Sequence, residues 1–415
     1  MEDRRAKLLG ECNQGSKQVL NWSCSIKRNE KIFVSRLIQS VLLTTFFCLS
    51  TPGRAGNALA QAKGSTSAAN VGPEEKALLL AAEREPGNVQ VVGSLGEYYL
   101  RKEEWRRSVR WLNEALMLSP GSESIGYDLA FAREQSGDLD GAKIQIDRML
   151  KQADSAKLHN LLASVEDRRG DFLEAAKDYH RAAEIDPSES NIFDLATFLL
   201  QHKKFTGFVD ESIKFFRYGV TQFPRSSQMR VGLGVALYAS DQYDEAVRVL
   251  CEAVDLDPTD RRPIDFLGKA RRVSPELAKE VDRRLQDFAE RYPENAATNY
   301  YYALSLWERG GGEQGKDLDR IEALLRRAES LASGWYEPHY QLGVLYENEK
   351  RYPEAIHEMQ TTAKIEPEFA PAHFQLAVLY SRTGDKLRAV QESGIVQRIK
   401  DKDRKEDAGQ DDVKR

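Results

Sequence analysis

The chain has little of the chemistry on which most enzyme and metal sites depend. It holds four cysteines, and three of them, Cys12, Cys24 and Cys48, lie within the first 50 residues. Cys251 is alone in the rest of the chain, so it has neither a disulfide partner nor a second thiol at metal-ligand spacing. A nucleophile elbow, an HExxH helix and a phosphate loop ending in Gly-Lys-Ser/Thr are also missing. We therefore expect no catalytic residues, no metal and no cofactor.

Two further absences bear on partners and fold. Residues 1–62 hold nine Lys or Arg and four Asp or Glu, which leaves 51 against 61 in the remainder, a net charge of −10. No basic stripe interrupts this acidic part, so we expect no nucleic-acid partner. Strand-like alternation is rare, whereas 41% apolar and 30% charged residues suit helices with one buried face. The composition predicts an all-α protein.

One short pattern returns about every 34 residues. A Leu-Gly or Leu-Ala pair recurs eight times, Tyr302-Ala303 fills the one gap, and the small residues of the series are Gly96, Ala130, Ala163, Ala196, Gly234, Gly268, Ala303, Gly343 and Ala377. In the regular copies a proline follows 24 residues later, as Pro120 follows Gly96. Self-similarity at one fixed period is typical of stacked repeats.

A single copy contains two helical stripes. In the copy at 89–122, Leu95, Gly96 and Tyr99 share one helical face, and a second stripe runs from Trp105 to Leu116. Proline then ends the second helix. The sequence from Leu-Gly through Tyr and Ala to Pro resembles the tetratricopeptide repeat. That resemblance implies a right-handed superhelical solenoid of about nine helix–turn–helix repeats. It is informative about the architecture of the protein and says little about its particular function.

The domain organisation follows from where the pattern holds. We expect a leader over residues 1–62, a linker over 63–72, the repeat array over 73–397 and a charged, disordered tail over 398–415. The segment 73–82 fits the second helix of an incomplete leading repeat. The copies between 261 and 335 deviate most, because one lacks the usual alanine and the next carries a glycine-rich insertion. We expect this region to be the weakest part of the array.

The leader resembles a secretory signal peptide. Its basic region and apolar core lie between about 27 and 50, and Ala-x-Ala steps follow at Ala58 and Ala60. The apolar run of 14 residues would rise only about 21 Å as a helix, against a hydrocarbon core of about 30 Å. We therefore expect cleavage, export to the periplasm or outside, and no stable membrane span afterwards. The alternative is an uncleaved leader that anchors the protein.

The inner surface of the array is the predicted binding site. In such solenoids the residues flanking the Leu-Gly pair on each first helix point inward. Here they form an apolar and aromatic groove, with candidate partner-binding residues Tyr127, Phe131, Asn160, Phe193, Val231, Tyr238, Tyr340 and Phe374. Aromatic anchors in a groove suit an extended or helical peptide. The alternative is that these rings only pack against neighbouring helices.

Two other readings of the same surface are weaker. Related repeat proteins hold chaperone carboxylates with a clamp of Lys, Asn and Arg, and only Asn160 resembles it here. His339 and His373 occupy equivalent places in adjacent repeats, yet no carboxylate or cysteine is seen to complete a metal site. We therefore expect a non-catalytic scaffold that binds a protein or peptide, for example in an envelope, secretion or polysaccharide-export assembly. The alternative is an accessory, recruiting module of an enzyme system such as a glycosyltransferase or peptidase complex. The oligomeric state stays open.

Overall fold

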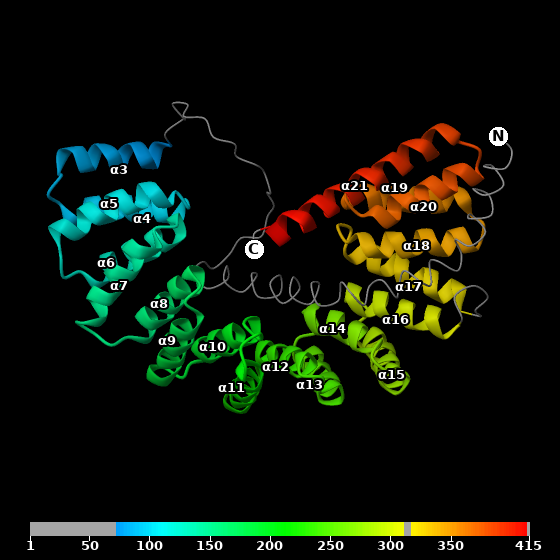
Figure 1. Cartoon of the computed structure of the whole chain (residues 1–415), viewed down its shortest axis with the longest axis horizontal. Coiled ribbons are helices and arrows are strands. Elements are labelled where there is room, and N and C mark those ends of the chain that lie inside the picture. The colour runs from blue at the N-terminus through cyan, green and yellow to red at the C-terminus, as the bar shows by residue number, and fades with distance from the viewer. Residues whose placement is uncertain (1–71, 311–316, 413–415) are drawn as a thin grey trace. The chain divides into compact units, whose positions relative to one another are not determined.

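The computed structural model describes residues 72–310 and 317–412. Within these ranges the chain forms 19 helices, α3 to α21, and no strand (Figure 1). It divides after Phe223 into two compact units, here called the N-terminal half and the C-terminal half. The all-α class with helix–turn–helix repeats is confirmed. The predicted leader, most of the linker and the insertion at 311–315 lie outside the described residues.

In both halves the first and second helices of successive repeats alternate along the chain. The N-terminal half contains α3 (Pro73–Arg84), α4 (Val89–Arg101), α5 (Trp105–Leu118), α6 (Glu123–Ser136), α7 (Leu139–Leu150), α8 (Ala156–Arg169), α9 (Phe172–Ile185), α10 (Glu189–Gln201) and α11 (Phe208–Gln222). The C-terminal half contains α12 (Ser227–Ala239), α13 (Tyr243–Leu256), α14 (Arg262–Ala270), α15 (Pro275–Arg291), α16 (Ala296–Arg309), α17 (Leu318–Leu331), α18 (Tyr336–Asn348), α19 (Tyr352–Ile365), α20 (Ala370–Arg382) and α21 (Lys386–Asp412). None of these helices is long and apolar enough to cross a membrane.

The turn inside a repeat has the same backbone conformation in six of the repeats. A residue with positive φ stands at the same point in six repeats, namely Glu103, Gly137, Gly170, Asp241, Lys350 and Gly384. The next N–H then bonds back to a carbonyl of the first helix, as Asp138 does to Arg133 at 2.9 Å. This closes the helix and reverses the chain. Three repeats therefore hold a side chain in a conformation that glycine adopts more easily.

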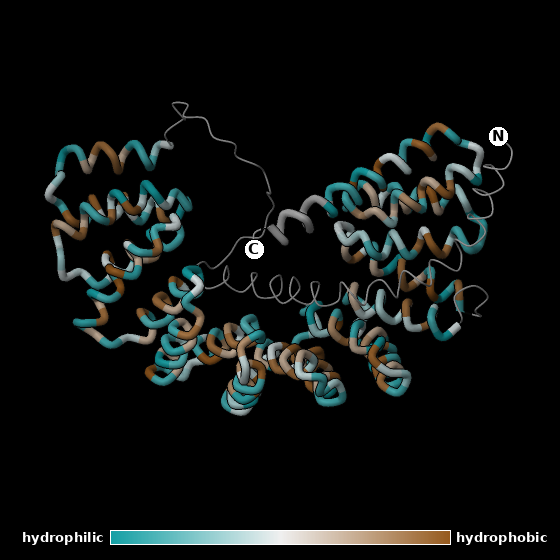
Figure 2. The backbone as a smooth tube through the Cα atoms, in the orientation of Figure 1, coloured by the Kyte–Doolittle hydropathy of each residue, from teal (hydrophilic) through white to brown (hydrophobic). Residues whose placement is uncertain are grey.

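Close contact between the two helices of a repeat depends on the small residue of the Leu-Gly or Leu-Ala pair. A Cβ on Gly96 would lie 2.7 Å from Leu112 of α5. Ser108 of α5 is buried and donates a hydrogen bond of 2.9 Å to the Gly96 carbonyl, and Ser212 does the same to Ala196 at 2.8 Å. Apolar residues follow stripes along the helices, as Figure 2 shows, and these stripes form the core.

Helix α3 takes the place of a second helix in front of the first complete repeat. Tyr99 of α4 donates a hydrogen bond of 2.8 Å to Glu75 of α3, and Arg107 pairs with the same carboxylate at 2.6 Å. In the C-terminal half Tyr346 donates to Glu322 of the preceding second helix, again 24 residues earlier, and Arg351 pairs with it at 3.0 Å. The same Tyr–Glu–Arg contact thus joins α3 to α4 and α17 to α18.

The last helix extends beyond the predicted end of the array. From residue 398 the sequence predicts a disordered tail, whereas α21 continues to Asp412. Its polar and charged residues lie at helical spacing: Gln397 donates to Asp401 at 3.0 Å, and Arg404 pairs with the same carboxylate at 3.5 Å. Missing apolar periodicity therefore indicates a solvated helix here, not a missing one.

Candidate functional site

Four of the predicted binding residues lie on the first helices of the N-terminal half. In this half α4 contacts α6, and α6 contacts α8, so that first helices of successive repeats are neighbours. Tyr127 and Phe131 lie on α6, Asn160 on α8 and Phe193 on α10. We call the surface formed by α4, α6, α8 and α10 the first-helix face.

Tyr127 and Phe131 are partly buried and keep part of their rings at the surface. Both pack against a buried cluster that includes Ile146. The Lys157 ammonium lies 3.6 Å from the centre of the Tyr127 ring, and burial raises the pKa of Tyr127 to about 12. Phe131 meets Trp105 edge to face, with ring centres 6.0 Å apart. These two rings therefore both support the stack and remain accessible in part.

Asn160 and Phe193 are more deeply integrated into the helix packing. Phe193 is only 6% exposed and packs edge to face on Phe216, with ring centres 5.8 Å apart. The Asn160 amide donates to Asn191 Oδ1 at 2.6 Å, and its own Oδ1 is buried without a hydrogen bond. Neighbouring side chains therefore cover the Phe193 ring and the Asn160 Oδ1, while Asn160 as a whole is only partly buried.

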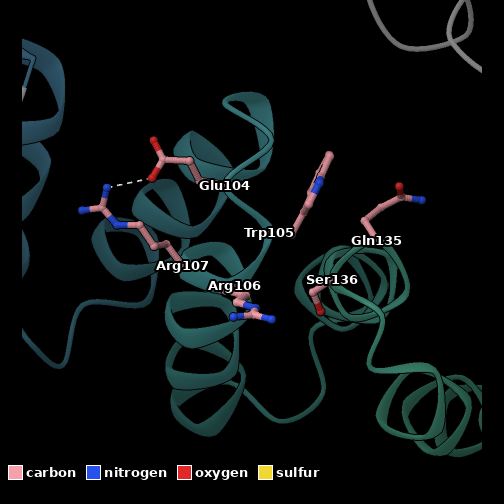
Figure 3. Close-up of a pocket in the computed structure, with 6 residues that line it drawn as sticks. All are labelled: Glu104, Trp105, Arg106, Arg107, Gln135 and Ser136. Atoms are coloured by element: carbon pink, nitrogen blue, oxygen red, sulfur yellow. Dashed lines mark hydrogen bonds and ion pairs between the residues drawn. The ribbon is translucent and has the colours of Figure 1, made fainter. Parts of the chain in front are cut away.

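An open pocket of about 390 Å³ lies beside Trp105, the ring that Phe131 contacts. It is bounded by the start of α5 and the end of α6, and Glu104, Trp105, Arg106, Arg107, Gln135 and Ser136 line it (Figure 3). Trp105 and Gln135 stand on opposite sides of the gap. The sequence places Trp105 on a packing stripe and gives no indication of the pocket. An aromatic residue directly after the turn is the only signal that could have marked it.

The two arginines in the pocket wall have different surroundings. Arg107 pairs with Glu104 at 2.8 Å and with Glu75 at 2.6 Å, and Figure 3 shows it turned toward Glu104. Arg106 is exposed and has no ion pair or hydrogen bond with any described residue. The pocket therefore combines an aromatic wall with one positive charge that no described residue pairs.

Farther along the first-helix face the charge is negative. Burial raises the pKa of Asp194 on α10 to about 6, while a hydrogen bond from Ser190 lowers it. Burial also raises the pKa of Asp128 on α6, as does nearby Glu97, and Lys157 lowers it. Among the described residues no cation forms an ion pair with Asp194. Sequence reasoning missed this acidic stretch because it considered only the apolar positions of these helices.

The four predicted residues of the C-terminal half differ in exposure. Val231 is buried, with 3% of its surface exposed. Tyr238 is half-buried and meets Tyr243 with ring centres 5.2 Å apart, while Tyr340 packs on Phe369 at 5.2 Å. Phe374 on α20 is 51% exposed and is the one large apolar side chain of the eight that stands mostly in solvent.

The structure also brings together a polar and aromatic cluster that the sequence did not indicate. In the C-terminal half the Arg261 guanidinium lies over the Trp335 ring at 3.8 Å and pairs with Asp265 at 2.9 Å. The Tyr300 ring also contacts Trp335, with ring centres 4.6 Å apart. Burial lowers the pKa of Lys269 to about 8, and Asp265 counters that shift.

Each of the two equivalent histidines pairs with a carboxylate of its own repeat. Nδ1 of His339 lies 2.8 Å from Glu358, and Nδ1 of His373 lies 2.6 Å from Glu392. The expectation that no carboxylate accompanies His339 was wrong, because Glu329 also lies 3.7 Å from it. Glu329, His339 and Glu358 could together offer metal ligands. Arg326 occupies both carboxylates, at 2.6 Å from Glu358 and 2.8 Å from Glu329, so an ionic network accounts for the cluster.

Solved structures of repeat proteins are similar to this chain at low identity. MamA is 20% identical with a TM-score of 0.35, and the match covers 42% of this chain and 97% of that one. YrrB, described as a TPR protein with an unusual peptide-binding site, is 18% identical with a TM-score of 0.36, covering 46% and 98%. A tetratricopeptide repeat protein from Parabacteroides merdae is 15% identical with a TM-score of 0.39, covering 63% and 97%. The chain matches none of the curated proteins with which it was compared.

A family model carries the assignment of the repeats themselves. Two stretches of the chain, residues 127–190 and 204–261, match the model described as tetratricopeptide repeat. The first stretch begins at Tyr127 and includes Phe131 and Asn160. The chain therefore contains tetratricopeptide repeats, and three of the predicted binding residues lie within one matched stretch.

Proposed function

We propose that this chain is a non-catalytic scaffold that binds a peptide-like segment of a partner protein on the first-helix face of its N-terminal half. The observation that carries the proposal is the pocket of about 390 Å³ between α5 and α6. Trp105 lines this pocket and contacts Phe131, which lies on the first-helix face. Interfaces draw most of their binding energy from a few aromatic or arginine residues around such pockets. Trp105, Phe131 and Arg106 supply both kinds.

Tyr127 and Phe131 extend this site along α6. They lie one helical turn apart, and each is partly exposed. Phe193 is buried, so we place it in the supporting core rather than in contact with the partner. A peptide would thus meet Trp105 and Phe131 at the pocket and Tyr127 farther along the helix.

The test uses the full chain and a peptide obtained by phage display. Truncating an aromatic anchor costs about 2 kcal/mol or more, so Tyr127→Ala with Phe131→Ala should weaken binding of the selected peptide more than tenfold. Leu173→Ala is the matched control, because Leu173 is an exposed apolar residue, 59% accessible, on second helix α9 of the same half. Circular dichroism must show that helicity and melting are kept. Unchanged affinity in a folded double variant would refute the site.

Export and the wider assembly are part of the same proposal. We propose that the leader is cleaved and that the scaffold acts in the periplasm or outside, in an envelope, secretion or polysaccharide-export assembly. The support is the basic region, the short apolar core and the Ala-x-Ala steps before residue 63. Sequencing of the native protein should find the mature N-terminus between Gln61 and Ser65. An intact leader on a protein that fractionates with the cytoplasm would contradict export.

A further inference from the structure

The unpaired charge in the α5–α6 pocket gives information about the partner. Trp105 provides an aromatic wall, and Arg106 is the one charged lining residue without an ion partner among residues 72–310 and 317–412, since Glu104 and Arg107 pair with each other at 2.8 Å. Resting on the proposed function, we propose that this pocket takes an apolar side chain of the partner that has a carboxylate beside it, with Trp105 contacting the apolar group and Arg106 the carboxylate.

The position of Arg106 has no explanation in the stability of the helix. It stands in the first turn of α5, a turn without any acidic residue, where the positive end of the helix dipole disfavours a cation. The neighbouring Arg107 meets the same cost, but it gains Glu75 and Glu104 and stacks on Tyr99 at 4.0 Å. Arg106 gains nothing comparable within the described residues. Its charge is available to an anion from outside.

The charges on the surrounding surface indicate at which end of the site the partner's carboxylate binds. Asp128 lies on α6 two helical turns before Gln135, and nearby Glu97 adds to the negative charge there. A carboxylate placed toward Tyr127 would meet these two groups. At the pocket it meets the Arg106 guanidinium, whose planar donors suit a carboxylate. The acidic group of the partner therefore belongs at the end of the site formed by α5.

Two small probes that differ only in charge test this chemistry on the full chain. Indole-3-propionate and tryptamine share an indole and a two-carbon arm, and end in a carboxylate and an ammonium group. The chain has five tryptophans, so its indole N–H signals can be resolved by NMR after selective labelling, and Trp105→Phe identifies the Trp105 signal. We expect indole-3-propionate to shift that signal and to bind about fivefold more tightly than tryptamine, a factor in keeping with exposed charge pairs.

Charge reversal distinguishes the effect of Arg106 on probe binding from the effect of the protein's overall electrostatic field. Arg106→Glu should invert the preference, so that tryptamine binds more tightly. Arg110→Glu is the matched control, because Arg110 is an exposed arginine of the same helix whose guanidinium lies over Trp111 at 5.1 Å, outside the pocket lining. That variant should keep the preference for the acid. Both variants alter exposed side chains, and circular dichroism confirms their fold.

The possible failures differ from one another. Equal binding of the two probes, or equal loss of the preference in both variants, would overturn the role of Arg106 and leave an aromatic pocket consistent with the proposed function. If neither probe shifts the Trp105 signal at millimolar concentration, the pocket does not accept such side chains. That result would overturn this inference and remove the observation that carries the proposed function.

Discussion

The close approach of the two helices in a repeat makes a specific prediction about stability. A Cβ on Gly234 would lie 2.6 Å from Cγ of Leu250, a branched carbon that moves only if this buried side chain leaves its χ1 rotamer. A Cβ on Gly343 would lie 2.8 Å from Cε of Met359, the free end of a flexible side chain, and 3.0 Å from its Cγ. Both glycines lie inside first helices of the C-terminal half.

The magnitudes of the opposing effects decide the outcome of alanine substitution. Overfilling a packed core costs about 1–3 kcal/mol, while replacing glycine by alanine inside a helix gains about 1 kcal/mol. Leu250 and Met359 are both fully buried. For Gly234→Ala the steric cost outweighs the helix gain, and we expect the free energy of unfolding to fall by up to about 2 kcal/mol. For Gly343→Ala, Met359 can rearrange, and we expect a change close to zero.

Urea unfolding followed by far-ultraviolet circular dichroism measures both variants. Gly394→Ala is the control, because a Cβ there would meet nothing within 4 Å and the variant should gain the helix term alone. The reasoning would be refuted if Gly343→Ala lost more stability than Gly234→Ala. It would also be refuted if Gly234→Ala matched Gly394→Ala.

Four further predictions concern charge, backbone, thiol chemistry and local stability. Asp194 has a folded pKa of about 6 against an ordinary 3.8, so its contribution to stability is fully present below about pH 4 and is lost as pH rises through 6. Asp194→Asn should therefore remove about 2–3 kcal/mol of the difference in unfolding free energy between pH 4 and pH 8. An unchanged difference would contradict the assignment. Lys350→Gly should raise stability by about 1 kcal/mol in a melting experiment, because Lys350 has a φ of 62°. Burial raises the pKa of Cys251 to about 12, so peptide mapping should find this thiol unmodified by iodoacetamide at pH 8 until the protein is unfolded. Hydrogen exchange should show lower protection over 261–335 than over 89–258, since α14 has only nine residues, and equal protection would refute this.

The repeat period predicted the architecture because each copy repeats the same physical requirements. A small residue, a buried aromatic ring and a proline at fixed spacing need the same helix pair every time, so Gly96, Gly234 and Gly343 all meet a buried side chain of the second helix. Irregular features were harder to predict. Helix α21 continues to Asp412 over a mostly charged stretch, because short-range pairs can support a solvated helix that has no apolar stripe.

The pocket could not be predicted from the sequence, and the two arginines show why. Arg106 and Arg107 are adjacent and chemically identical, yet about 100° of helix rotation separates their side chains. One of them meets Glu75, 32 residues earlier on α3, and the other faces the gap beside Trp105. A period of 34 residues describes what the repeats share, whereas this difference depends on a contact between two particular repeats. The features that decide what a repeat protein binds therefore lie where its copies differ, and only the packed structure shows which charge is already satisfied.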